Sequence, residues 1–395
     1  MWTNTNKIFF IGVAFNSFRM LIGATSAMFL LSKGMSFTEV GAMKTLQAIV
    51  ILFADIPLGY FADKKSRKGS ILASMLFASL WLFTTAIGDS KALLYLAEVF
   101  NSLSIALLGG AFTAYLLDIA KLEKNESTHS ILGQYQKYQF LTMGIAALLG
   151  CSFVSIDSNI VWKISGIAIL GLFCLSCFIL PQDISSVHAE SSNGSFGDDF
   201  RAIKKNLQLY KNEFKCILFQ LLLASTTYQI LIQFWQPLSD IESFAIGSTG
   251  IQYGIAFCFI LIVQSKASSL ASKTSNTQKI ISNSNFASFA ILILSIFISI
   301  FAKELLAISV ILIFAVNRYM TVGLQGSFHK LVEDKHRATA ESIFSTLLRA
   351  VLIFGMPTIG FFLGKFGIYP LLALLGTSLV YGVSKIGFRE SKQCT

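Results

Sequence analysis

Three arginines stand inside long apolar stretches of the sequence: Arg19, Arg318 and Arg349. A guanidinium in the interior of a bilayer costs at least about 2.5 kcal/mol, so an arginine there usually has a partner or a function. Its planar fork matches the oxygens of a carboxylate or a phosphate. These residues therefore predict a site for an anionic organic solute, with carboxylate-bearing solutes favoured. The alternative is that all three are structural, bonded to Glu98, Asp55 or backbone carbonyls.

Two carboxylates, Glu98 and Asp55, lie deep enough in apolar stretches to balance these arginines, with Glu98 displaced outward and Asp55 inward. The predicted cavity is therefore net positive. Apolar surroundings favour the neutral form of a carboxylate, which makes Glu98 and Asp55 the candidates for proton carriage. For Asp55, which closely precedes Pro57, packing at a kinked helix end is an equal alternative.

The elements that position these residues are membrane-spanning helices. With 54% hydrophobic and 13% charged residues, the chain cannot fold as one water-soluble globule of 395 residues. A hydrocarbon core of about 30 Å needs about 20 apolar residues per helix. Such runs predict twelve spans, at 7–31, 37–61, 69–88, 92–117, 131–156, 160–180, 214–235, 246–267, 280–302, 305–328, 342–363 and 368–386.

The positions of lysine and arginine predict the orientation of these spans. Most of the 31 basic residues fall in alternate loops and in the tails, which places those loops and both termini in the cytoplasm. The net charge of +10 is therefore a topology signal. It does not indicate nucleic-acid binding, because the cations are spread over separate loops. The first span has no cleavage site, and we interpret it as a permanent helix.

A polar stretch at 181–213 divides the spans into six and six, which predicts an N-terminal bundle at 1–180 and a C-terminal bundle at 214–395. Within it, apolar residues recur every three or four positions, which predicts an amphipathic helix on the cytoplasmic leaflet. The alternative is a soluble helix that binds a partner. The apolar residues are Phe196, Phe200, Ile203, Leu207, Tyr210 and Phe214.

The loop after the second span carries the most specific motif, Gly-Tyr-Phe-Ala-Asp-Lys-Lys-Ser-Arg-Lys at positions 59–68. It resembles the signature of the major facilitator superfamily of secondary transporters, although Ser66 replaces the usual glycine. The matching positions are Gly59, Ala62, Asp63, Arg67 and Lys68, with Asp55 and Pro57 preceding them as in one subgroup. The segment at 337–342 is similar to that subgroup's entry into helix eleven. The resemblance implies an all-α polytopic membrane protein with twelve transmembrane helices in two pseudo-symmetric six-helix bundles.

In that superfamily, helices one, four, seven and ten line a cavity near the middle of the membrane, where alternating access exposes the substrate to each side in turn. The resemblance therefore implies a substrate site built from polar residues of these helices, with one more arginine from helix eleven. The residues are Asn16, Arg19, Glu98, Asn101, Gln229, Gln233, Trp235, Asn317, Arg318 and Arg349.

The motif loop also predicts a gating latch on the cytoplasmic side. Asp63 is placed to meet the N–H groups at the start of helix eleven, and Asp118 to pair with Arg67. Such contacts would favour the state closed to the inside. The alternative is a static topology determinant. The predicted latch residues are Gly59, Asp63, Arg67, Lys68 and Asp118.

These observations predict a secondary transporter of a small anionic solute, coupled to protons, with organic acids and hydroxycarboxylate siderophores among the candidates. Efflux of drugs or metabolites by proton antiport is the alternative. Drug/proton antiporters of this superfamily often carry a glycine- and proline-rich signature in helix five and a basic residue in helix four. Here helix five has no proline between Gly144 and Gly150 and helix four has no cation after Lys91, which weakens this alternative. A receptor or a lipid translocator on the same scaffold is an alternative of another class. Import and export are left open.

An enzyme is not expected, because no paired catalytic groups lie at mid-depth and the sequence has no phosphate-binding glycine loop. We expect no cofactor and no metal site. The expected partners are the anionic solute, protons and membrane lipids, with no nucleic acid. The protein is expected to be a monomer in a bacterial inner membrane.

Overall fold

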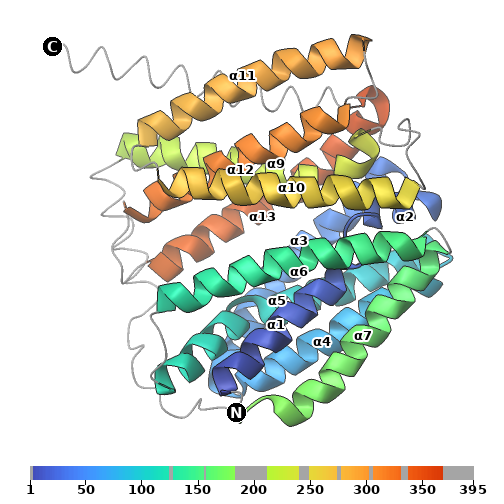
Figure 1. The fold of residues 1–395 in the computed structure, drawn as a ribbon, viewed down its shortest axis with the longest axis vertical. Helices are drawn as coiled ribbons and strands as arrows, with labels where there is room; N and C mark the ends of the chain where they lie inside the picture. Colours follow the sequence, from blue (N-terminus) through green and yellow to red (C-terminus); the bar gives the residue numbers. More distant parts are fainter. Residues whose placement is uncertain are drawn as a thin grey trace. The chain divides into compact units, whose positions relative to one another are not determined.

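In a computed structural model of the protein, the described residues are 3–123, 128–154, 157–182, 211–239, 249–273, 277–301, 306–330 and 337–367. All the regular elements in these ranges are helices, labelled in Figure 1. They are α1 (Asn4–Met20), α2 (Ser26–Ser32), α3 (Phe37–Lys64), α4 (Arg67–Ile87), α5 (Lys91–Leu122), α6 (Thr128–Val154), α7 (Ser158–Ile179), α9 (Lys211–Leu238), α10 (Thr249–Ser272), α11 (Thr277–Phe301), α12 (Leu306–Lys330) and α13 (Arg337–Phe366).

Within the described ranges, 10 helices are long and apolar enough to cross a membrane. They correspond to the predicted spans two to eleven, and the all-α polytopic fold is confirmed. The predicted span at 368–386 lies outside the described residues, as does nearly all of the amphipathic helix predicted at 196–214. The predicted division of the chain at 181–213 stays a prediction.

The first predicted span is not continuous, and this expectation was wrong. α1 ends at Met20 and α2 begins at Ser26, with short turns between them in which Gly23 N donates to Met20 O (2.9 Å) and Thr25 N to Ile22 O (3.1 Å). Tertiary contacts explain the break. The Ser165 hydroxyl donates to the Phe18 carbonyl at 2.5 Å, which diverts a carbonyl of the last turn of α1.

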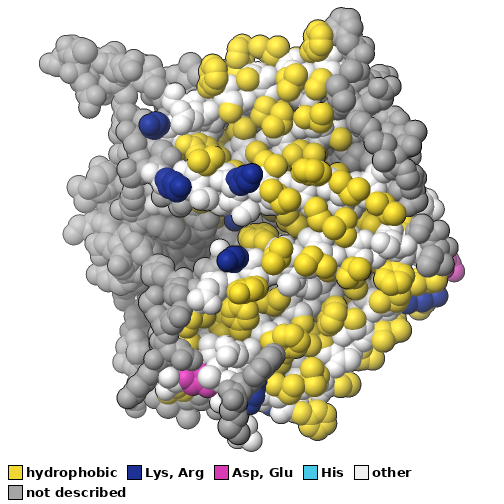
Figure 2. Space-filling view, viewed as in Figure 1, with side chains coloured by type: hydrophobic (Ala, Val, Ile, Leu, Met, Phe, Trp, Pro, Cys, Tyr) yellow, Lys and Arg dark blue, Asp and Glu magenta, His cyan; other side chains and the backbone are white. Residues whose placement is uncertain are grey.

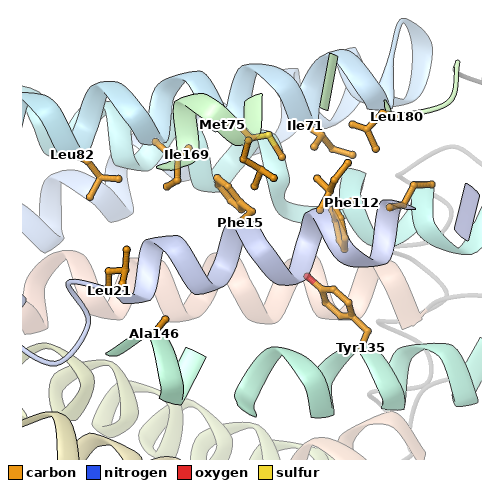
Figure 3. Packing of buried hydrophobic residues seen from close by; sticks show 14 of the residues in the cluster. Phe15, Leu21, Ile71, Met75, Leu82, Phe112, Tyr135, Ala146, Ile169 and Leu180 are labelled. Carbon is orange, nitrogen blue, oxygen red and sulfur yellow. The ribbon is translucent and has the colours of Figure 1, made fainter. Parts of the chain in front are cut away.

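Contacts between Cα atoms divide the chain into two compact units, and the first comprises residues 1–35, 42–192 and 246–258. In it, α4 packs on α5 and α7, while α1 packs on α5, α6 and α7. Figure 3 shows buried side chains of α1, α4 and α5 meeting in this core, among them Phe15, Met75 and Phe112. The core fixes α1 against the helices that carry its polar partners.

The second unit comprises residues 36–41, 193–245 and 259–395. Among its described helices, α9 packs on α12 and α13, and α11 packs on α12. Buried apolar residues of α9, α11, α12 and α13 form its core, including Leu221, Leu324 and Phe328. A Cβ on Gly360 would come within 2.5 Å of the Phe37 carbonyl oxygen, so glycine allows the start of α3 to lie close against α13.

The described surface is rich in large apolar side chains. Phe178 is 89% exposed, and Phe53, Phe286 and Phe354 are also exposed. On the face drawn in Figure 2, hydrophobic side chains cover much of the described surface and cations are few. Apolar surface on this scale is unsuited to water, and it fits a chain whose helices face lipid.

Candidate functional site

Arg19 lies in the last turn of α1, directly before the helix break. Its Nη2 donates to the Asn101 Oδ1 at 2.6 Å and its Nη1 to the Ser104 Oγ at 3.1 Å. The guanidinium also lies 5.1 Å from the ring centroid of Trp81 and 5.6 Å from that of Phe15. Each of these partners is neutral, so they orient the cation and form no ion pair with it.

The carboxylate of Glu98 has a different cationic partner. Lys44 Nζ lies 2.7 Å from Glu98 Oε1, and the two side chains are 19% and 3% exposed. The same Oε1 accepts a hydrogen bond from Asn101 Nδ2 at 3.2 Å. One amide therefore separates Glu98 from Arg19, and two cations and one carboxylate leave the cluster with one net positive charge. We call Arg19, Lys44, Glu98 and Asn101 the charged cluster.

Arg19 also lines a cavity of about 400 Å³ within the first unit. Its walls come from α1, α5 and α6 and combine one cation with amide, hydroxyl and apolar groups. The lining residues are Asn16, Arg19, Ile105, Leu108, Gly109, Phe112, Thr113, Tyr135 and Gln139. A cavity of this size and mixed lining is typical of sites for small molecules.

Asn16 and Tyr135 fix the shape of this cavity. The Asn16 Nδ2 donates to the Tyr135 hydroxyl at 3.1 Å and to the Gly12 carbonyl at 2.9 Å. Figure 3 shows Tyr135 reaching from α6 with its hydroxyl toward α1. A Cβ on Gly12 would collide with the end of the Phe112 ring, so glycine at that position lets this ring approach α1 closely.

The predicted site residues of the second unit have other surroundings. Gln229 is exposed, Gln233 is half-buried and Trp235 is buried. Asn317 Nδ2 donates to the Ala224 carbonyl at 2.8 Å, and Arg318 Nε to the Ser268 Oγ at 3.0 Å. These bonds tie α12 to α9 and to α10.

Two further predicted residues, Asp55 and Arg349, are half-buried on α3 and α13. Neither lines the cavity described above. The roles predicted for Asp55, for Arg349 and for the polar residues of α9 and α12 stay predictions.

At the predicted latch, Arg67 and Asp118 form an ion pair between α4 and α5, the contact that the sequence led us to expect. Lys68 Nζ donates to the carbonyls of Leu180 (2.8 Å) and Cys177 (3.2 Å), at the end of α7, where the helix dipole favours a cation. Gly59 is exposed on α3, and the side chain of Asp63 lies outside the described part. The gating role stays a prediction.

Lys44 was not among the predicted site residues, nor was the cavity wall formed by α6, which includes Tyr135 and Gln139. A signal for Lys44 existed. It stands seven residues after Phe37, the first residue of α3, and Glu98 stands seven residues after Lys91, the first residue of α5. Two helices that start on the same side of a membrane place such residues at equal depth, where opposite charges can pair.

A second missed residue, Glu123, holds the start of α1. Its Oε1 accepts from Asn4 N at 2.7 Å, and its Oε2 accepts from Thr5 N at 3.1 Å and from the Thr5 hydroxyl at 2.6 Å. Burial raises the pKa of this carboxyl, but the hydrogen bonds from Thr5 and Asn4 together outweigh burial and keep the pKa below its ordinary value.

Comparison with known proteins places this architecture in a family. A curated relative, the uncharacterized MFS-type transporter YxaM of Bacillus subtilis (strain 168), is 27% identical over 219 residues, which are 54% of this chain and 53% of that protein. The chain thus spans about half the length of the curated relative that it matches.

Solved structures share the fold over nearly the whole chain. The nucleoside transporter NupG matches with a TM-score of 0.77 at 16% identity, over 98% of this chain and 99% of that one. A bacterial homolog of the human lysosomal transporter Spinster, inward-facing and occupied, matches with a TM-score of 0.66 at 12% identity, over 97% and 93%. All these relatives are transporters, in agreement with the expectation that the chain is not an enzyme.

The family model of the Major Facilitator Superfamily matches residues 8–329, which include the motif loop, the charged cluster and the helices that line the cavity. On this match, the chain belongs to the Major Facilitator Superfamily.

Proposed function

We propose that this chain is a secondary active transporter that moves a small carboxylate-bearing anion across a bacterial inner membrane by alternating access, coupled to protons. The observation that carries the proposal is the guanidinium of Arg19, which lines a cavity of about 400 Å³ while its hydrogen bonds go to the neutral Asn101 and Ser104. A cation held in place by neutral partners, while the nearby carboxylate of Glu98 is engaged by Lys44, is suited to bind an anion that arrives from outside.

The cavity lining supports a small organic anion rather than an inorganic ion. Phe112 and Tyr135 offer ring surface, while Asn16, Thr113 and Gln139 offer amide and hydroxyl groups around the cation. In this proposal Arg19 binds the carboxylate and the polar groups orient the remainder of the solute. Glu98, beside the site and almost fully buried, carries the proton.

The remaining predicted features belong to the same proposal. Residues 1–180 and 214–395 form the two bundles, 181–213 joins them, and both termini lie in the cytoplasm. Arg318, Gln229 and the other predicted residues of the second unit keep their predicted role in substrate binding. The segment from Gly59 to Lys68 acts as the latch with Asp118. The transporter acts as a monomer.

Uptake into proteoliposomes tests the transport function. Radiolabelled benzoate, succinate and citrate are offered with and without an imposed pH gradient, and uridine serves as a neutral comparison because the fold resembles a nucleoside transporter. We expect gradient-dependent uptake of at least one carboxylate and none of uridine. Uptake of uridine alone, or binding without flux, contradicts the proposal.

Substitution of Arg19 tests the site. Arg19→Ala should lower carboxylate uptake at least tenfold, and Arg19→Lys should recover part of it because the charge is kept and the fork is lost. The matched control is Lys33→Ala, which removes a cation that pairs with the exposed Asp89. Equal uptake by Arg19→Ala and the native protein would exclude Arg19 as the anion-binding group.

A further inference from the structure

The charged cluster contains a competition between two cations for one carboxylate. Glu98 is paired with Lys44 at 2.7 Å, and only the side-chain amide of Asn101 separates it from Arg19. Arg19 offers a bidentate fork and is a strong partner for a carboxylate. In the structure Lys44 nevertheless holds Glu98, and the Arg19 guanidinium lies against Trp81.

A buried carboxylate is costly to leave unpaired. If Lys44 lost its charge, Glu98 would therefore lie beside one other cation of the cluster, Arg19. Rotation of the two side chains would then form an ion pair between Glu98 and Arg19 in place of the contacts with Asn101. The guanidinium would then be neutralised within the protein.

We propose that Lys44 is a positioning residue that sets the specificity of the cavity for anions, because it engages Glu98 and so leaves the charge of Arg19 available to a solute. The inference rests on the proposed function, in which Arg19 binds the anionic solute. It makes the pair of Lys44 and Glu98 a unit, in which Lys44 matters only while Glu98 carries its charge.

This dependence is tested by the binding of succinate to the purified full chain, measured by ligand-induced thermal stabilisation. Lys44→Met should weaken succinate binding at least tenfold, and Lys44→Arg should bind within about threefold of the native protein. The double variant Lys44→Met with Glu98→Gln should bind succinate with an affinity within about threefold of that of Glu98→Gln alone. The reason is that neither variant retains the Glu98 carboxylate, which could otherwise pair with Arg19.

Two results overturn the inference. The first is native-like succinate binding by Lys44→Met. The second is a double variant that binds more than tenfold weaker than Glu98→Gln, which would mean that Lys44 contacts the solute itself. The second comparison stands even where Lys44→Met alone fails to fold, because replacing both members of a buried pair is far better tolerated than removing one.

A measurement without solute separates this inference from the proposed function. Trp81 fluorescence, obtained as the difference between each variant and the same variant with Trp81→Phe, reports whether the guanidinium lies on the indole. We expect an emission change in Lys44→Met that is absent from the double variant. If succinate does not bind the native protein, the proposed function loses its support. The Trp81 emission then tests by itself whether Lys44 keeps Glu98 away from Arg19. Unchanged emission in Lys44→Met then overturns the inference.

Discussion

At the scale of single residues, Glu123 shows how a carboxylate on one helix completes another. The first N–H groups of a helix have no partner within the helix and carry its positive dipole end. Glu123, after the end of α5, accepts from two of these groups in α1 and from the Thr5 hydroxyl. It thereby fixes the entry of the helix that carries Arg19.

We therefore predict that Glu123→Gln lowers stability by about 1 kcal/mol at neutral pH, as the loss of a helix cap does. The pKa of the Glu123 carboxyl is lower in the folded protein than its ordinary value. The stabilisation by this carboxylate is therefore fully present at a pH above the ordinary pKa, and it is lost as the pH falls through the lowered pKa of the folded protein. Thermal unfolding from pH 7 to pH 4 should show the difference from the native protein shrinking on acidification.

The matched control for this prediction is Asp89→Asn, because the side chain of Asp89 is 95% exposed and its pair with Lys33 is long, at 3.4 Å. Exposed pairs of this kind contribute little. A gap between native protein and Glu123→Gln that persists unchanged at pH 4 would contradict the capping role of the carboxylate.

The residue scale also shows what could be predicted of the site. Arg19 was expected on chemical grounds and Asn16 from the family resemblance, and both line the cavity. Asn101 was expected in the lining too, yet it links Arg19 to Glu98. The wall around Tyr135 was not expected, because the rotation of α6 about its axis is set by its packing on α1. Sequence spacing along a span does not encode that rotation.

At the scale of elements, α6 comes close to the turn that follows α1. A Cβ on Gly150 would collide with the carbonyl oxygen of Leu21, so only glycine lets the helix lie against the turn. The residues of the break, Leu-Ile-Gly-Ala-Thr, are mostly apolar and predict a continuous span. The prediction of one continuous helix was wrong there, because the contacts that shape the turn come from residues more than a hundred positions away in the sequence.

Gly150→Ala should therefore destabilise the protein by about 1–3 kcal/mol, the usual range for overpacking, and should weaken succinate binding through a displaced Arg19. Gly171→Ala is the control, since a Cβ there meets no atom within 4 Å and alanine favours a helix. The measurements are thermal unfolding and succinate binding. Equal behaviour of the two variants would show that the turn tolerates movement of α6.

At the scale of the whole molecule, the apolar lengths of the helices carried the sequence prediction furthest. Ten predicted spans correspond to described helices that could cross a membrane. This success has a physical reason, because a bilayer imposes one length and one polarity on every span. Packing inside the bundle has no such uniform rule, and the site is where prediction fell short.

The orientation is open to a direct test in cells. In a variant without native cysteines, Asp89→Cys in the turn between α4 and α5 should react with an impermeant maleimide applied to intact cells, whereas Lys65→Cys between α3 and α4 should not. Inside-out vesicles should reverse the pattern. Labelling of Lys65→Cys from outside would invert the topology and place both termini in the periplasm.

The gap in the hydrogen-bond ladder between Met20 and Ser26 has a mechanical consequence. An unbroken helix transmits a tilt at one end to the other, whereas a turn absorbs it. The direction of α2 is thus set by its own packing, in which the ring centroid of Phe29 lies 4.9 Å from that of Trp162, and not by the direction of α1. The first predicted span is jointed, since α1, which carries Arg19, and α2 meet at a turn and need not share one axis.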